Sequence, residues 1–206
     1  VLAYNGIEGL RPTGAALPRN GTFRIAYVGN VYLGRDPRPF LSALASVRRT
    51  LQLTPAQVRV DFAGNCTSFR GVQLQSLVDE LGLSEYVHFH GWMSRDKALK
   101  LQEESDLLLL LAQDQPIQIP NKLFEYLGMG KPILAFADEN GETTRILRSV
   151  GGHHVVTGNS AAQAESAMLT ALDHNGEERV DYDAAVLQEL LAEHQMARLI
   201  RHLRAV

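Results

Sequence analysis

The chain has 206 residues, of which 45% are hydrophobic. This is enough for one well-buried core and too few for two ordinary domains with linkers. Its 20 basic and 23 acidic residues leave a formal net charge of -3. The charge therefore offers no positive surplus to hold a nucleic-acid backbone or an anionic membrane, and a small-molecule ligand is the expected partner.

A single cysteine, Cys66, excludes an internal disulfide and favours a reducing compartment, so we expect a cytoplasmic location. The longest apolar run, Leu107 to Ala112, is far shorter than the roughly 18 to 20 residues that cross a bilayer. We therefore expect no transmembrane segment. The start, Val1 to Tyr4, has neither an initiator methionine nor a charged stretch before an apolar one. It is typical of the cut edge of a longer chain and not of a signal peptide.

Residues 1–22 are dense in glycine, proline and asparagine, as in Asn5-Gly6 and Asn20-Gly21, and they have no sustained apolar period. This composition is typical of a linker. We expect residues 1–22 to be an interdomain linker, with Tyr4 to Gly21 as a hinge of little regular structure that buries no apolar face. Residues 23–206 are expected to form one domain.

From Phe23 onward, short apolar runs alternate with amphipathic stretches. The apolar runs predict strands at Phe23 to Val28, Val58 to Phe62, Tyr86 to Phe89, Asp106 to Leu111, Pro132 to Phe136 and His153 to Val156. The amphipathic stretches predict helices near residues 38–50, 71–82, 95–104, 121–129, 142–149 and 161–173. Apolar strands joined by single helices form a parallel sheet that is covered on both faces. The expected fold class is α/β, a Rossmann-like doubly wound parallel sheet of about six strands.

In such a sheet, ligands bind beyond the carboxyl ends of the strands, so function is expected in the loops that follow them. The last segment, Ala184 to Arg204, has apolar residues at roughly helical spacing and ends with three arginines that suit a helix C-terminus. We therefore expect a helix over this segment.

The most informative stretch runs from Pro120 to Pro132 and predicts a short helix between two buried strands. Proline suits the first helical position, and Gly130 before Pro132 is a usual stop. The residues before Pro120 are poor caps, so the N–H groups at the helix start lack a side-chain acceptor. A bound phosphate supplies one, because helix N-termini attract anions.

Two charged residues follow in this helix. Lys122 adds a positive charge near the helix start, and Glu125 lies roughly 7 Å along the axis from Pro120. A carboxylate there can accept hydrogen bonds from both hydroxyls of a ribose whose diphosphate rests on the helix start. In the alternative interpretation, Asn121 caps the helix and Lys122 pairs with Glu125 at i, i+3 on a solvated face.

The loop after the first strand contains two glycines and Arg35 just before a helix. Gly29 lets the backbone approach a phosphate, Asn30 lies beside it, and Arg35 can grip a phosphate with two hydrogen bonds. The loop does not match the G-x-G-x-x-G spacing of a dinucleotide site or the Lys-Ser/Thr of a Walker loop. The alternative is that Arg35 only pairs with Asp36 or with another surface acid.

Trp92 and Met93 follow the third strand, at the edge where a base or a sugar can rest on an aromatic or thioether side chain. A tryptophan that is buried for packing is the alternative. The histidines at 88, 90, 153 and 154 lack metal-ligand spacing, so we interpret them as structural and expect no metal site.

The run from Pro120 to Ala135, PNKLFEYLGMGKPILA, closely resembles the helix and following strand of the donor domain in family 4 retaining glycosyltransferases, which have the GT-B fold. Tyr4 to Glu8 is similar to the Asn-Gly-Ile-Asp motif that ends their acceptor domain, and Ala26 to Gly34 to their first donor-domain strand and loop. Val87 to Trp92 and Ser105 to Leu107 are similar to their third and fourth strands. The resemblance covers nearly the whole chain.

The resemblance implies that Glu125 binds the ribose and that Asn121, Lys122, Leu123 and the helix start hold the diphosphate and donor sugar. It further implies that Gly29, Asn30 and Arg35 face the phosphates from the opposite loop, with Trp92 and Met93 near the base. Many members carry a second glutamate eight residues before the first, and this chain has Ile117 there. The sugar contact of that glutamate is therefore not carried over.

The hypothesis is a retaining, metal-independent transfer of sugar from a nucleotide diphosphate sugar, the substrate, with no further cofactor. The synthesis of bacterial surface polysaccharide or glycoconjugate is the implied setting, and peripheral membrane association of the full enzyme stays open. The resemblance also implies an N-terminal acceptor domain that this chain lacks. The segment from Ala184 to Arg204 would pack against that domain, so its apolar side chains are expected to be exposed in this chain. The fragment alone is expected to bind donor without turnover. Two alternatives are a fragment of a GT-B nucleotide-sugar epimerase and a non-enzymatic flavodoxin-like binding module.

Overall fold

The computed structural model describes residues 3–10, 21–173 and 182–204 of the chain. Its main feature is a six-stranded sheet with the order β5-β2-β1-β6-β7-β8, in which every neighbouring pair is parallel. The strands are β1 (Phe23–Val28), β2 (Val58–Ala63), β5 (Val87–Gly91), β6 (Leu107–Ala112), β7 (Ile133–Ala137) and β8 (His154–Thr157). The six predicted strands are therefore confirmed. A short hairpin of β3 (Ser68–Phe69) and β4 (Val72–Gln73) was not predicted.

The strand order confirms the Rossmann-like fold class. Counted along the chain, the parallel strands lie in the order 3-2-1-4-5-6, which is the Rossmann order and differs from the flavodoxin-like order 2-1-3-4-5. The order reverses between β1 and β6. In open parallel sheets, ligands bind beyond the carboxyl ends of the strands at such a reversal, so the loops after β1 and β6 are the first place to seek a site.

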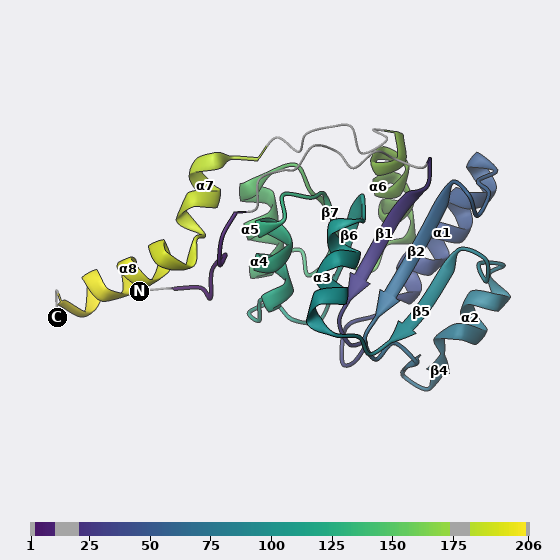
Figure 1. The fold of residues 1–206 in the computed structure, drawn as a ribbon, viewed down its shortest axis with the longest axis horizontal. Coiled ribbons are helices and arrows are strands. Elements are labelled where there is room, and N and C mark those ends of the chain that lie inside the picture. Colours follow the sequence, from purple (N-terminus) through teal and green to yellow (C-terminus); the bar gives the residue numbers. More distant parts are fainter. Residues whose placement is uncertain (1–2, 11–20, 174–181, 205–206) are drawn as a thin grey trace.

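Helices cover the two faces of the sheet as separate layers (Figure 1). One face packs against α1 (Arg38–Leu51), α2 (Leu74–Glu80) and α6 (Ala161–Asp173). The other packs against α3 (Arg95–Glu103), α4 (Asn121–Gly128) and α5 (Glu142–Val150). These six helices confirm the predicted helical stretches.

Strand β6 shows why the apolar runs form a buried sheet. All six of its residues, LLLLLA, are buried. Leu107, Leu109 and Leu111 belong to the core on the α1 side, whereas Leu108 and Leu110 belong to the core on the α4 side. Because successive side chains of a strand point to opposite faces, a central parallel strand needs apolar residues at every position.

The C-terminal segment forms two helices instead of the one that was predicted. They are α7 (Ala184–Glu189) and α8 (Ala192–Arg204), and α8 extends away from the sheet (Figure 1). Leu187 and Leu190 are buried against the domain, so the expectation that the apolar residues of this segment are exposed is wrong for α7. It is confirmed for Met196, Ile200 and Leu203 of α8, which are exposed. No helix of the described residues is long and apolar enough to cross a membrane.

The described part of the N-terminal segment, residues 3–10, has no helix and only an isolated bridge between Ile7 and Leu191. Ile7 is nevertheless 2% exposed, and its backbone bonds to Leu190 and Ala192. The expectation that this segment buries no apolar face is therefore wrong at Ile7, because a bridge to the C-terminal helices holds it in the core. Residues 11–20 of the predicted hinge lie outside the described residues.

Candidate functional site

Three loops meet at the carboxyl edge of the sheet and are tied together by hydrogen bonds. The Gln113 side chain after β6 donates to the backbone oxygen of Asp36 after β1, at 2.7 Å. The Asp138 carboxylate after β7 accepts from the backbone amides of Asp114 and Gln115, at 3.2 and 2.7 Å. A Cβ on Gly34 would lie 2.3 Å from the Gln113 backbone oxygen, so only glycine fits there. The loops after β1, β6 and β7 are therefore held in fixed positions relative to one another.

Helix α4 begins at this edge without a side-chain cap. Pro120, which was expected to be the first helical residue, is instead the N-cap residue, and no described side chain accepts from the first amides. The Asn121 Oδ1 atom instead accepts from the Asn5 side chain at 2.6 Å. The alternative in which Asn121 caps the helix is therefore wrong. The N–H groups at the start of α4 keep the partial positive charge that attracts anions.

Lys122 and Glu125 lie close together on α4. The Lys122 Nζ atom is 2.6 Å from the Glu125 Oε2 atom, and their side chains are 31% and 33% exposed. The predicted i, i+3 pair is therefore present, and it is compatible with binding because both groups still reach solvent. Leu123 is fully buried, and its amide donates to the Pro120 oxygen at 2.9 Å. Tyr126 is also buried, and its hydroxyl accepts from the Val28 amide at 3.2 Å, which anchors α4 to the end of β1.

The loop after β1 places Arg35 opposite α4. Burial raises the pKa of Tyr27 on β1 and of Tyr126 on α4, and the positive charge of Arg35 opposes both rises. The guanidinium lies over the Tyr32 ring, 4.5 Å from its centroid, and its Nε atom is buried without a hydrogen-bond partner. Arg35 forms no ion pair with any residue that the structure describes. The alternative of an Arg35–Asp36 pair is wrong, because Asp36 binds Arg38 at 2.7 Å instead.

Gly29 and Asn30 brace the same loop. The Gly29 amide donates to Ala63 at 2.9 Å, and the Asn30 side chain accepts from the Asn65 amide at 2.9 Å. Asn30 therefore supports the neighbouring loop after β2 through its side chain. Gly64 in that loop has φ +115°, and a Cβ there would lie 2.2 Å from the Gly29 oxygen. The glycines of this region permit the close approach of two loops, whether or not a phosphate is bound.

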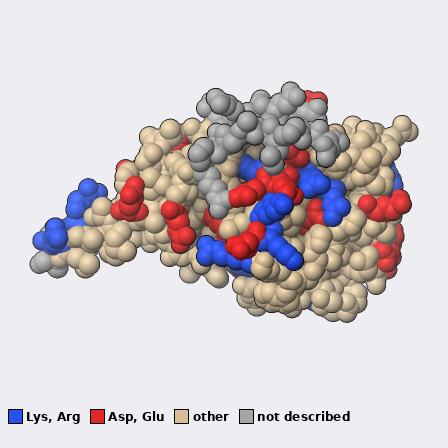
Figure 2. Space-filling model, viewed as in Figure 1, with Lys and Arg blue, Asp and Glu red and all other residues tan. Residues whose placement is uncertain are grey.

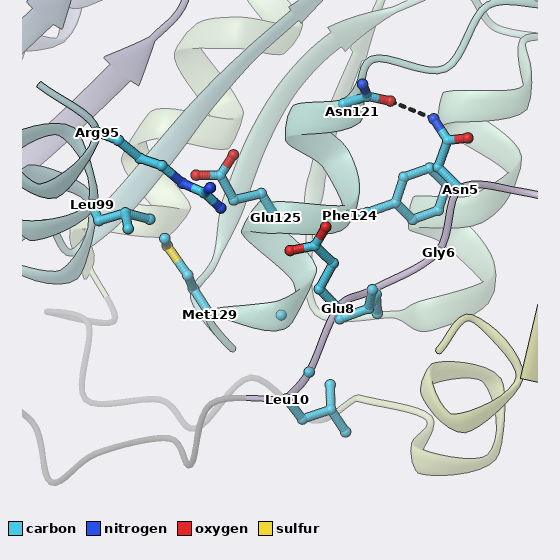
Figure 3. Close-up of a pocket in the computed structure, with 13 residues that line it drawn as sticks. Asn5, Gly6, Glu8, Leu10, Arg95, Leu99, Asn121, Phe124, Glu125 and Met129 are labelled. Carbon is cyan, nitrogen blue, oxygen red and sulfur yellow. Dashed lines mark hydrogen bonds between the residues drawn. The ribbon is translucent and has the colours of Figure 1, made fainter. Parts of the chain in front are cut away.

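A pocket of about 590 Å³ lies between α3, α4 and the N-terminal segment (Figure 3). Glu125 and Asn121 line it from α4, which places the predicted ribose carboxylate at a cavity wall. Sequence reasoning missed two of its charged residues, Arg95 at the start of α3 and Glu8 of the N-terminal segment. A signal for Arg95 was available, because the first turn of a helix favours acids over bases.

Trp92 and Met93 do not line this pocket. Trp92 is 77% exposed, so the alternative of a tryptophan buried for packing is wrong. Met93 is partly buried in the same loop, which joins β5 to α3. Their placement near a base stays a prediction.

The histidines have structural surroundings. The His90 Nε2 atom lies 2.7 Å from the Oδ1 atom of Asp61, which also binds Arg59 in a bidentate pair at 2.8 to 3.0 Å. Burial lowers the pKa of His153 to about 3, which keeps it neutral. No group of three possible metal ligands occurs among the described residues. On the face shown in Figure 2, acidic and basic residues are interspersed over α3, β1 and β2.

A family model described as "Glycosyl transferases group 1" matches residues 22–174. The chain belongs to this family. The family and the Rossmann-like sheet confirm the predicted glycosyltransferase resemblance. No protein of curated function matches the chain in sequence.

Solved glycosyltransferases of GT-B fold have a similar structure. HepE of Anabaena in complex with UDP has a TM-score of 0.70 and 16% identity, over 90% of this chain and 50% of that chain. The lipopolysaccharide outer core galactosyltransferase WaaB has a TM-score of 0.65 and 15% identity, over 100% of this chain and 54% of that chain. WaaG, a glycosyltransferase involved in lipopolysaccharide biosynthesis, has a TM-score of 0.61 and 18% identity, over 92% of this chain and 50% of that chain. The chain thus spans about half the length of these structures.

Proposed function

We propose that this chain is the donor-binding half of a retaining glycosyltransferase, which holds a nucleotide diphosphate sugar for transfer to an acceptor. The observation that carries the proposal is the uncapped start of α4 at the carboxyl edge, with Lys122 and Glu125 on the same helix. The family match and the UDP bound by HepE support it.

The main role of the site residues would be to stabilise the negative charge of the diphosphate. The amides at the start of α4, Lys122 and Arg35 supply positive charge from two sides to a diphosphate, which gains negative charge as the sugar departs. Groups that are fixed in place before the reaction stabilise this charge without reorganisation. Gly29 would contribute backbone groups, and Asn30 and Asn121 amide groups. Leu123, which is fully buried, would support the helix start from the core. No metal or further cofactor is needed for these contacts.

Glu125 would hold the nucleoside. Its carboxylate offers two acceptor oxygens to the two ribose hydroxyls, and it lies about one helical turn beyond the start of α4. The pair with Lys122 would orient the carboxylate before the ligand binds.

The acceptor would be held elsewhere. The chain spans about half of the similar glycosyltransferases, so we propose that a second, N-terminal domain of the same polypeptide binds the acceptor. Because WaaB and WaaG take part in lipopolysaccharide synthesis, a cytoplasmic role in bacterial surface polysaccharide or glycoconjugate synthesis is the proposed setting. Residues 1–206 alone are then expected to bind donor without transferring sugar, and measurable transfer by them would contradict this division of labour.

Calorimetric and thermal-shift titration of the chain with UDP, GDP and ADP tests the proposal. At least one nucleoside diphosphate is expected to bind and to raise the unfolding temperature, since a ligand at 100 times its dissociation constant stabilises the fold by about 2.7 kcal/mol. The matching nucleosides without phosphate are the control and are expected to bind more weakly. A flat response to every nucleoside diphosphate would favour a non-enzymatic binding module instead.

A further inference from the structure

Asn5 lies between two anchored residues of the N-terminal segment. The Tyr4 amide donates to the Gln195 side chain at 2.9 Å, and the Ile7 amide donates to the Leu190 backbone oxygen at 2.8 Å. The chain is therefore fixed on both sides of Asn5. A side chain on an ordered backbone has less conformational entropy to lose when it forms a hydrogen bond, so Asn5 is well placed to hold a neighbouring group although it is exposed.

The Asn5 side chain contacts the first residue of α4. Its Nδ2 atom donates to the Asn121 Oδ1 atom at 2.6 Å, and both residues line the pocket beside α4 (Figure 3). Asn121 begins α4, and no described side chain caps the first amides of this helix. The bond therefore lies beside the helix start, where the proposed function places the diphosphate.

This bond decides which end of the Asn121 amide faces a ligand. A side-chain amide has an oxygen that accepts hydrogen bonds on one branch and an NH2 group that donates on the other. Because Asn5 donates to the oxygen, the NH2 group is left for another molecule. A phosphate oxygen is negative and accepts hydrogen bonds, so it is attracted by the NH2 group and repelled by the amide oxygen.

Without Asn5, the Asn121 amide would have a competing arrangement. Asparagine side chains form hydrogen bonds with nearby backbone N–H groups, and the first amides of α4 are free of a side-chain cap. An Asn121 oxygen turned toward these amides would use the donors that attract an anion and would place a partial negative charge beside them. The contact with Asn5 prevents this arrangement.

We propose that Asn5 is a positioning residue of the donor site, which turns the Asn121 oxygen away from the start of α4 and leaves the Asn121 NH2 group for the diphosphate. This inference rests on the proposed function, because it requires a diphosphate at the helix start. Asn5 acts through Asn121 and does not itself contact the ligand. Residues 3–10 thereby take part in donor binding, although they lie outside the sheet and its covering helices.

A double-mutant cycle of Asn5→Ala and Asn121→Ala tests this role. Calorimetric titration uses whichever of UDP, GDP and ADP binds the wild type best, with the matching nucleoside as a control. Asn5→Ala is expected to weaken diphosphate binding roughly three- to tenfold, the effect of one hydrogen bond, and to leave nucleoside binding unchanged. In the Asn121→Ala background the same change is expected to have no further effect, because the two residues act as one unit. An equal loss in both backgrounds would overturn the proposal.

Asn5→Asp reverses the direction of the bond. A carboxylate only accepts, so it binds the Asn121 NH2 group and turns the Asn121 oxygen toward the phosphate. Diphosphate binding is expected to be weaker than in Asn5→Ala. The same change in the Asn121→Ala background measures the effect of the added charge alone and is expected to be smaller. Equal effects of Asn5→Asp in the two backgrounds would contradict the orientation of the amide.

Tyr4→Phe is the matched control for docking of the segment. It removes the hydrogen bonds of the Tyr4 hydroxyl with Glu142 and Arg145, keeps a ring beside Phe124, and leaves Asn121 untouched. Its diphosphate affinity is expected to equal that of the wild type. If Tyr4→Phe weakens the diphosphate as much as Asn5→Ala does, the segment acts by its docking, and the positioning role is overturned.

Two further outcomes separate this inference from the function on which it rests. If no nucleoside diphosphate binds the wild type, the proposed function fails, and the role of Asn5 fails with it. If a diphosphate binds and Asn5→Ala leaves its affinity unchanged, the donor site stands and only the role of Asn5 is wrong. Thermal unfolding of each variant shows that it is folded.

Discussion

Two carboxylates of this domain, Asp61 and Glu125, each contact a cation, and their surroundings differ. The Asp61 side chain on β2 is 2% exposed and is bound by Arg59 and by His90 of β5. The Glu125 side chain on α4 is 33% exposed and is bound only by Lys122 among the residues described, at the start of an uncapped helix.

The difference separates a group that serves the fold from one that is available to a ligand. A buried carboxylate must have its hydrogen bonds satisfied within the protein, and Asp61 does. Glu125 keeps an open side toward the pocket, so its hydrogen-bonding capacity is left for another molecule. Changing each carboxylate in turn tests whether this separation holds.

The largest effect on stability is expected from Asp61→Asn. The substitution weakens charge-assisted hydrogen bonds from Arg59 and His90 and is expected to lower the free energy of unfolding by about 2–3 kcal/mol, measured by urea denaturation. Glu104→Gln is the control, because its pairs with Arg24 and Lys100 are exposed and each is worth about 0.5 kcal/mol or less. Equal losses for the two variants would break the comparison.

Glu125→Gln is expected to show the opposite pattern. Loss of a charge-assisted hydrogen bond to ribose, worth about 1.5–3 kcal/mol, weakens nucleoside diphosphate binding by about one to two orders of magnitude. Stability changes by at most about 0.5 kcal/mol, because only the pair with Lys122 is lost. Calorimetric titration measures the affinity. Unchanged affinity would assign Glu125 to the surface and not to the site.

The sheet and α4 could be predicted from the sequence because their signals are local. Leu107 to Ala112 is apolar at every position, and the residues from Pro120 to Pro132 carry both a start and a stop for a helix. Local patterns suffice where the chain's own periodicity decides which side is buried. Arg35 was also proposed from a local signal, its place in the loop after β1, and its role stays a prediction.

The remaining features depend on contacts between distant segments. Ile7 is buried only because the chain bonds to Leu190 and Ala192 of the C-terminal segment. Arg95 and Glu8 meet at one pocket although 87 residues separate them. Gly34 is required by the position of Gln113 in another loop. A single sequence shows none of these neighbours, so the walls of the site could not be predicted.

A smaller effect on the free energy of unfolding is expected when the pH is lowered. Burial raises the pKa of Asp61, but hydrogen bonds from Arg59 and His90 outweigh it and hold the pKa below its ordinary value. A depressed pKa in the folded state contributes stability above the unfolded-state pKa of about 4, which is lost as the pH falls through the folded-state pKa. Between about pH 5 and about pH 2, the free energy of unfolding measured by urea denaturation is expected to fall more for the wild type than for Asp61→Asn. Parallel losses would show that Asp61 is not the group that titrates.

The smallest effect on the fold is expected from Lys122→Gln, which tests whether the charge at the start of α4 serves a ligand. Removing a cation from a helix start relieves its repulsion by the macrodipole, and the lost pair with Glu125 offsets this gain, so stability stays within about 0.5 kcal/mol of wild type. Binding of the nucleoside diphosphate is expected to weaken by about three- to tenfold, because an exposed charge contact contributes about 1 kcal/mol.

The free nucleoside separates a phosphate contact from a general loss of the site. Its affinity is expected to be the same for wild type and Lys122→Gln, because it carries no phosphate for the lysine to contact. The loss for the diphosphate is expected to shrink as salt is raised, since exposed charges are screened. If the variant loses affinity for the nucleoside and for the diphosphate equally, Lys122 acts by orienting Glu125. Its positive charge then serves the ribose carboxylate through their ion pair and does not contact the phosphate.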